Sequence, residues 1–407
     1  MAKRFIVLFL LISGFYKVYA QELQLTALKV EQLINPLGID AKQPNLSWQI
    51  VSSKRGVAQI AYQVLVASTA EKLAQNEGDL WNSQKLNSSE SIYVKYNGKT
   101  LNSRTKCFWK VKVWTSIGES QWSETSFWTM GLLYYKDWPK GWIGLDKAFP
   151  WDNIETDSRL SARYFRKEFK SEKKIQSATA SIVGLGLYEL FINGKKVSDD
   201  VLAPSPTDYN QNVKANTYDV TSYIQNGKNA IGAVLGNGRY FAMRQDEKPY
   251  KIKTFGFPRM LLNLHLVYTD GSIQNIETDN TWKGTADGPI RTNNEYDGEE
   301  YDANKEFAGW NKAGFDDSKW LIADYVQEPS GTIESQMNAN MKVMKTLQPV
   351  SVQKISGNRY ILDMGQNMVG WLQIKVKGLK GEQVKLRFAE SLQDNGELFT
   401  ANLRNAK

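Results

Sequence analysis

The densest group of side chains that could do chemistry lies between residues 293 and 304 of this 407-residue chain. Five carboxylates fall within that segment: Glu295, Asp297, Glu299, Glu300 and Asp302. Paired carboxylates are what general acid–base catalysis requires, because one group donates a proton while another accepts one. The segment also contains Gly298 and has the composition of a strand-poor loop, which favours a solvated acidic turn over a catalytic pair.

The same segment partly matches a calcium-binding loop. Asn293, Glu295, Asp297 and Gly298 fall at positions 1, 3, 5 and 6 of such a loop. Position 12 is Asn304 instead of the bidentate glutamate that completes the usual ligand set, so the match is partial. Asn293, Glu295 and Asp297 are therefore the candidate ligands of a weak Ca²⁺ site, and we expect no other cofactor.

Two residue types are scarce enough to exclude whole classes of site. The single histidine, His265, excludes metal sites built from several histidines, and the single cysteine, Cys107, excludes an internal disulfide framework. Both residues lie in strand-like runs of the sequence. We therefore expect both to serve packing rather than catalysis.

Charge and hydropathy exclude two broad classes of partner. The chain has a net charge of +8, but its basic residues are scattered among acidic ones without an arginine-rich stripe. Nucleic-acid binding is therefore not expected. After the first twenty residues no segment is long and apolar enough to cross a membrane, so we expect no membrane span in the mature chain.

Residues 1–20 have the pattern of a secretory signal peptide. Lys3 and Arg4 form a basic start, and residues 5–15 form an apolar run that is too short to span a bilayer. Residues 18–20, Val-Tyr-Ala, resemble a small-x-small cleavage site. An uncleaved anchor helix is the alternative. We expect cleavage and a secreted protein, located in the periplasm or on the outer surface.

Apolar and polar residues alternate along most of the chain, which predicts β-strands. The clearest runs are residues 60–67, 107–114, 180–192, 371–376 and 383–388. Asn193-Gly194 follows one of them directly, and this dipeptide indicates a hairpin because a type I′ turn needs positive φ at both positions. A short helix is expected only at residues 69–77, with Thr69 as its N-cap.

This pattern predicts an all-β fold of tandem β-sandwiches in three units. The first unit spans residues 22–130, and a larger sandwich spans residues 142–335. After a weakly patterned link that contains Met337, Met341 and Met344, the third unit occupies residues 346–407.

The third unit has only about 60 residues, too few for a sandwich in which both sheets are covered. We therefore expect an unfinished sandwich whose apolar side chains stay poorly buried. The residues concerned are Trp371, Leu372, Ile374, Val376, Val384, Leu386 and Phe388.

Short motifs follow one another in a characteristic order through all three units. In the first unit they are NPLGID at 35–40, PNLSW at 44–48, QIAYQVLVA at 59–67 and WSE at 122–124. In the second they are ARYFRKEF at 162–169, LYELFINGKKV at 187–197, LGNGRYF at 235–241 and DDSKW at 316–320. The third opens with LDMGQNMVGW at 362–371. Together these motifs resemble the opening of bacterial α-L-rhamnosidases of glycoside hydrolase family 78.

The resemblance implies a fibronectin-III-like domain, then a carbohydrate-binding-module-like sandwich, then the start of a third β-domain. It also implies that the acid and base of this inverting hydrolysis lie in a downstream (α/α)₆ barrel, so no catalytic residue is assigned in this chain. The chain would be the accessory part of an exported enzyme that hydrolyses terminal α-L-rhamnosyl residues. Its partners would be a rhamnose-containing glycan and the missing catalytic domain.

Two alternatives belong to other functional classes: a stand-alone carbohydrate-binding protein without catalysis, and an adhesion protein built from fibronectin-like units. If the chain binds carbohydrate, as part of the enzyme or as a stand-alone protein, the candidate contacts are Asp208, Tyr209, Asn237, Arg239 and Tyr240. These residues would form a polar and aromatic rim that contacts either sugar hydroxyls or the neighbouring barrel, whereas the plainer interpretation is a pair of tight turns. Many relatives have a tryptophan before the Thr-Asp-Tyr motif, where this chain has residues 204–207, Pro-Ser-Pro-Thr.

We predict that signal peptidase cleaves after Ala20, so that the mature protein begins at Gln21. N-terminal sequencing of the secreted protein checks the site directly. Recovery of the intact N-terminus in a cytoplasmic fraction would contradict the prediction.

Overall fold

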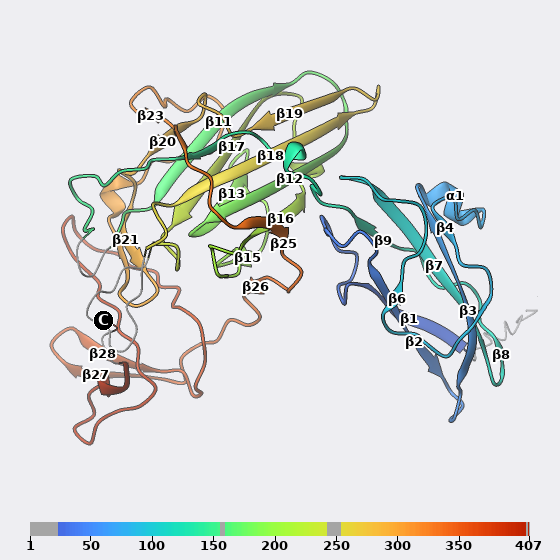
Figure 1. The fold of residues 1–407 in the computed structure, drawn as a ribbon. Helices are drawn as coiled ribbons and strands as arrows, with labels where there is room; N and C mark the ends of the chain where they lie inside the picture. Colours follow the sequence, from blue (N-terminus) through green and yellow to red (C-terminus); the bar gives the residue numbers. More distant parts are fainter. Residues whose placement is uncertain (1–22, 155–158, 242–253, 404–405, 407) are drawn as a thin grey trace, which may run out of the picture. The chain divides into compact units, whose positions relative to one another are not determined.

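A computed structural model describes residues 23–154, 159–241, 254–403 and 406. The predicted signal peptide lies outside these residues. The described part is built almost wholly of strands, and its one α-helix is α1 (Ala70–Ala74) (Figure 1). The all-β prediction is confirmed. No helix in this part of the chain is long and apolar enough to cross a membrane.

The first unit, mostly residues 23–129, is an immunoglobulin-like pair of sheets. One sheet contains β1 (Leu23–Val30), β2 (Asn45–Ser52) and β6 (Val94–Lys95). The other contains β3 (Gln59–Ala67), β4 (Trp81–Asn82), β5 (Leu86–Asn87), β7 (Lys106–Thr115), β8 (Gly118–Glu119) and β9 (Ser126–Thr129). Trp48, Trp109 and Trp128 are buried in this unit.

Cys107 and Thr69 have the roles in the first unit that their sequence contexts predict. Cys107 is a buried residue of β7, and burial raises the pKa of its thiol to about 12, so the reactive thiolate is not formed near neutral pH. Thr69 caps α1, because its hydroxyl accepts a hydrogen bond from the backbone N–H of Lys72 at 3.3 Å.

The second unit contains a sandwich of two larger sheets (Figure 1). The seven-stranded sheet contains β10 (Trp142–Gly144), β12 (Ile175–Leu185), β16 (Asn212–Asp219), β18 (Arg259–Tyr268), β19 (Ile273–Glu277), β24 (Asp324–Val326) and β25 (Thr332–Ser335). The six-stranded sheet contains β11 (Arg163–Ser171), β13 (Leu187–Ile192), β14 (Lys195–Lys196), β17 (Gly227–Gly236), β20 (Lys283–Thr285) and β23 (Leu321–Ile322).

The core of this unit gathers apolar side chains from both sheets. Ile182 and Leu264 come from the seven-stranded sheet, Phe165 and Ile231 come from the six-stranded sheet, and Trp282 precedes β20. All five are fully buried. Burying each such side chain stabilises the fold by about 1.5–3 kcal/mol. The strand-like context of His265 is confirmed, since it lies in β18, where burial lowers the pKa of its imidazole.

Two turns set the path of the chain between neighbouring strands. Asn193 and Gly194 have φ of 51° and 83° and join β13 to β14, so the predicted hairpin is confirmed. The run at residues 180–192 is not one strand, because Gly186 divides it into β12 and β13. Gly186 has φ of 105°, and a Cβ there would overlap the carbonyl oxygen of Gly236.

The predicted third unit, residues 346–407, belongs to the second compact unit of the structure and differs from its predicted strand content. Its described strands are β27 (Ser351–Ser356) and β28 (Arg359–Asp363), which pair as a hairpin. The predicted strands at residues 371–376 and 383–388 are wrong, because these residues pair with no described segment. The expected poor burial is confirmed: of the seven residues named, six are exposed and Leu372 is half-buried.

Gly186→Ala should destabilise the middle sandwich by about 3 kcal/mol, because it adds a backbone clash to the strain of positive φ. Gly271→Ala is the matched control, since Gly271 has φ of 80° but open space around its Cβ position. The control should cost about 1 kcal/mol. Urea unfolding of both variants measures the difference, and equal losses would contradict the close packing at Gly186.

Candidate functional site

The structure brings the two groups of candidate residues together. Residues 237–241 form the turn that follows β17, and Asp208 and Tyr209 lie in the loop before β16. The acidic segment forms the tip of a hairpin between β21 (Ile290–Asn294) and β22 (Gly298–Tyr301). Its prediction as a strand-poor loop is therefore wrong. Cross-strand hydrogen bonding imposes the hairpin, while the side chains of β22 stay exposed, as expected for solvated acids.

Asn237 joins the turn to the hairpin from a fully buried position. Its backbone N–H donates to Asn293 Oδ1 at 2.7 Å, and its Nδ2 donates to the Asn293 carbonyl at 2.5 Å. Asn293 Nδ2 in turn donates to the carbonyl of Leu160 at 3.0 Å. Both asparagines therefore hydrogen-bond backbone groups of neighbouring segments, whereas Asn237 Oδ1 is buried without a hydrogen-bond partner in the described part of the chain.

Tyr209 and Tyr240 are also buried, and they pack edge to face with ring centroids 5.2 Å apart. Burial, together with the nearby Glu295 carboxylate, raises the pKa of Tyr209 to about 12. Phe255 packs against both rings, at 5.1 Å from Tyr209 and 6.0 Å from Tyr240, and is 40% exposed. Phe255 is thus the accessible aromatic residue here. Phe255 was not among the predicted contacts, because nothing in the local sequence pattern marks it.

Arg239 and Asp208 are the two candidate residues that face solvent. Arg239 Nε lies 3.0 Å from Glu295 Oε2, and the side chains are 59% and 32% exposed, so the pair contributes little stability. Asp208 accepts a hydrogen bond from the backbone N–H of Asn210 at 3.1 Å. These residues and Phe255 are the groups near which a ligand could bind without rearrangement.

The predicted calcium ligands are not arranged as a ligand set. Asn293 Oδ1 is held by the N–H of Asn237, and Glu295 is paired with Arg239. Within the described residues no three His, Cys, Asp or Glu side chains come together in a way that could hold a metal ion. The calcium site stays a prediction, and no chemistry is derived from it.

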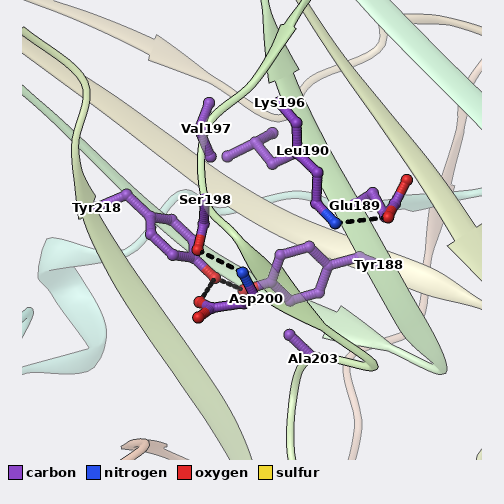
Figure 2. A pocket seen from close by; sticks show the side chains of 9 residues that line it. All are labelled: Tyr188, Glu189, Leu190, Lys196, Val197, Ser198, Asp200, Ala203 and Tyr218. Atoms are coloured by element: carbon purple, nitrogen blue, oxygen red, sulfur yellow. Dashed lines mark hydrogen bonds and ion pairs between the residues drawn. The ribbon is translucent and has the colours of Figure 1, made fainter. Parts of the chain in front are cut away.

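A small pocket lies elsewhere on the sandwich, between β13, β16 and the loop after β14 (Figure 2). Tyr188 and Tyr218 line it with their hydroxyl oxygens 2.9 Å apart, and Tyr218 donates to Asp200 Oδ2 at 3.1 Å. Burial raises the pKa of both tyrosines. The pocket volume of about 10 Å³ is roughly what one water molecule needs, so no sugar ring fits.

Three family models match the chain in succession. Residues 25–134 match the Rha78A-like, N-terminal immunoglobulin domain, and residues 173–345 match the alpha-L-rhamnosidase N-terminal domain. Residues 353–407 match the bacterial alpha-L-rhamnosidase concanavalin-like domain. The chain belongs to the α-L-rhamnosidase family. The family resemblance predicted from the sequence motifs is thereby confirmed.

Individual α-L-rhamnosidases extend the match along nearly the whole chain. One from Formosa agariphila is 36% identical over 380 residues, which make up 89% of this chain and 40% of the relative. The structure from Dictyoglumus thermophilum is 38% identical with a TM-score of 0.86, and the match covers 94% of this chain and 43% of that one.

The Streptomyces avermitilis α-L-rhamnosidase complexed with L-rhamnose is 27% identical with a TM-score of 0.82. That match covers 94% of this chain and 53% of the other. The chain therefore spans about half, or less, of the length of the α-L-rhamnosidases that it matches.

Asn237→Ala should destabilise the sandwich by about 1–3 kcal/mol, because it removes a fully buried side chain and leaves the carbonyl of Asn293 without its donor. Arg239→Ala, two residues away, should change the stability by no more than about 0.5 kcal/mol. Thermal unfolding of the two variants tests this contrast. A loss from Arg239→Ala as large as that from Asn237→Ala would show that the exposed pair is structural.

Proposed function

We propose that the chain forms the N-terminal accessory β-domains of an exported α-L-rhamnosidase that hydrolyses terminal α-L-rhamnosyl residues of a glycan. The observation that carries the proposal is the ordered match to three rhamnosidase domains within only 40–53% of the relatives' length. Export is proposed from the signal-like pattern of residues 1–20, with the periplasm or outer surface as the destination.

The bond-breaking step is assigned to a part of the enzyme outside these residues. Inverting hydrolysis needs two carboxyl groups roughly 6.5–9.5 Å apart, on either side of a bound sugar. The pocket beside Asp200 is too small for a sugar ring. Partial desolvation and the nearby Glu189 carboxylate raise the pKa of Glu299, as a general acid requires. This residue nevertheless lies on a strand that is exposed to solvent, and not in a sugar-sized pocket.

The middle sandwich is proposed to contribute weak binding of rhamnose. Asp208 and Arg239 can exchange hydrogen bonds with sugar hydroxyls, and Phe255 can pack against the apolar face of the ring. Tyr209, Asn237 and Tyr240 support this surface from below and do not reach the ligand. With so few contacts, affinity between roughly micromolar and millimolar is expected.

Purified residues 21–407 should not release nitrophenol from a nitrophenyl α-L-rhamnoside above the buffer blank. The reason is that the acid and base of the reaction are proposed to lie outside these residues, and the pocket beside Asp200 is too small for a sugar ring. Glu299→Gln and Asp302→Asn are the diagnostic variants. Turnover by the parent chain that is lost in either variant would place the active site in the β21–β22 hairpin.

Calorimetric titration of residues 21–407 with L-rhamnose should give weak binding, with and without added calcium. Arg239→Ala should reduce the affinity by about tenfold, as expected for loss of one charge-assisted hydrogen bond. Lys173→Ala is the control, because its exposed pair with Asp270 lies at the β18–β19 end of the sandwich. Absence of heat at millimolar sugar in both conditions would rule out the proposed binding.

A further inference from the structure

The chain stays paired with the middle sandwich beyond β25, the last strand of its seven-stranded sheet along the sequence. Residues 332–335 form β25, the strand at one edge of the seven-stranded sheet, and lie parallel to β16, with Thr332 opposite Asn212 and Ser335 opposite Ala215. The sequence pattern predicted only a weakly patterned link after residue 335. Met341 and Lys342 form β26, which pairs with β15 (Asp200–Val201). Two successive strands therefore attach this segment to the sandwich, in place of the solvated chain usual for a linker.

Asp200 lies where the second attachment is made. Its side chain is only 7% exposed, and its Oδ2 accepts a hydrogen bond from Asn340 Nδ2 at 2.7 Å. Lys342 Nζ lies 3.9 Å from Asp200 Oδ1 and 2.7 Å from Asp199 Oδ1. The sandwich itself supplies one further donor, the hydroxyl of Tyr218 (Figure 2). Undocking would remove the Asn340 donor and the nearest cation from a buried carboxylate, which is costly.

Two amide side chains extend the contact beyond Asp200. Asn340 Nδ2 also donates to Oδ1 of the buried Asn216 at 3.0 Å, and Gln336 Oε1 accepts from the backbone N–H of Ser205 at 3.0 Å. Gln336 and Asn340 are hydrogen-bonded to each other. The backbone N–H of Gln336 donates to the carbonyl of Ala215 at 2.9 Å. The bonds thus run continuously from β25 to β26.

We propose that residues 332–342 form a strap that is docked on the middle sandwich and locked at Asp200 by Asn340. The chain therefore leaves the sandwich from a fixed point at Lys342 rather than through a flexible linker. In a longer protein this strap would restrict the orientation of whatever follows. The pairing of β25 and β26 and the burial of Asp200 support the strap independently of the proposed function.

Hydrogen exchange measured by mass spectrometry on residues 21–407 tests the docking. Backbone amides of residues 332–335 and 341–342 that bond to the sandwich should exchange at least about 100-fold more slowly than those of Val343 and Met344, which lie outside any strand. Equal exchange in the two sets would overturn the proposal.

Two substitutions test the lock, and a third is the control. Asn340→Ala removes the donor to Asp200 and Asn216 from a residue outside the core, so exchange at residues 340–342 should rise by roughly tenfold or more. Asp200→Asn should produce a rise in the same amides. Glu334→Gln alters only the partly exposed pair with Lys214 and should leave their exchange unchanged.

The protection of β12 and β18 distinguishes release of the strap from unfolding of the sandwich. If Asn340→Ala raises exchange in residues 340–342 while both core strands stay protected, the lock is supported. If Asn340→Ala leaves residues 340–342 as protected as in the parent chain, the lock is refuted. If Asp200→Asn also unfolds the core strands, the result with Asn340→Ala alone determines whether the lock at Asp200 is supported or refuted.

Discussion

Mutual burial of the two inner sheet faces is the interaction on which the middle sandwich depends. Phe165 and Ile231 on one sheet meet Ile182 and Leu264 on the other, and together with Trp282 they exclude water from the space between. Because this core fixes β12, β17 and β18, it also fixes where their connecting turns emerge. The candidate sugar contacts, the hairpin β21–β22 and the small pocket are all consequences of that arrangement.

Most polar residues at these turns hydrogen-bond other parts of the fold and are therefore not available to a ligand. A turn that ends a buried strand carries backbone groups that need partners, and Asn237 and Asn293 provide them by bonding to each other and to Leu160. Tyr209 and Tyr240 fill the space beneath. The side chains that a ligand can reach are the exposed ones, Arg239, Asp208 and Phe255. Because they offer few contacts, the proposed binding is weak.

The strap and residues 371–376 both show that a segment forms a strand only where a neighbouring segment can pair with it. Residues 332–335 have little alternation, yet they form a strand because the open edge of β16 offers hydrogen-bonding partners. Residues 371–376 alternate clearly, yet they form no strand, because no described segment pairs with them and no second sheet covers their apolar side. The alternation of apolar and polar residues determines which face a strand would bury. The strand itself forms only where a neighbouring segment pairs with it.

The sequence by itself determined the all-β class, the Asn193-Gly194 hairpin, the cap at Thr69 and the family, because each depends on local backbone preference or on motif order. Tertiary structure alone decided that Tyr209, Tyr240 and Asn237 are buried, that Phe255 is accessible and that Asp200 holds a strap. These outcomes depend on contacts between segments far apart in the chain, such as Asp200 with Asn340. Residue type and local spacing do not specify which distant segment will supply the partner.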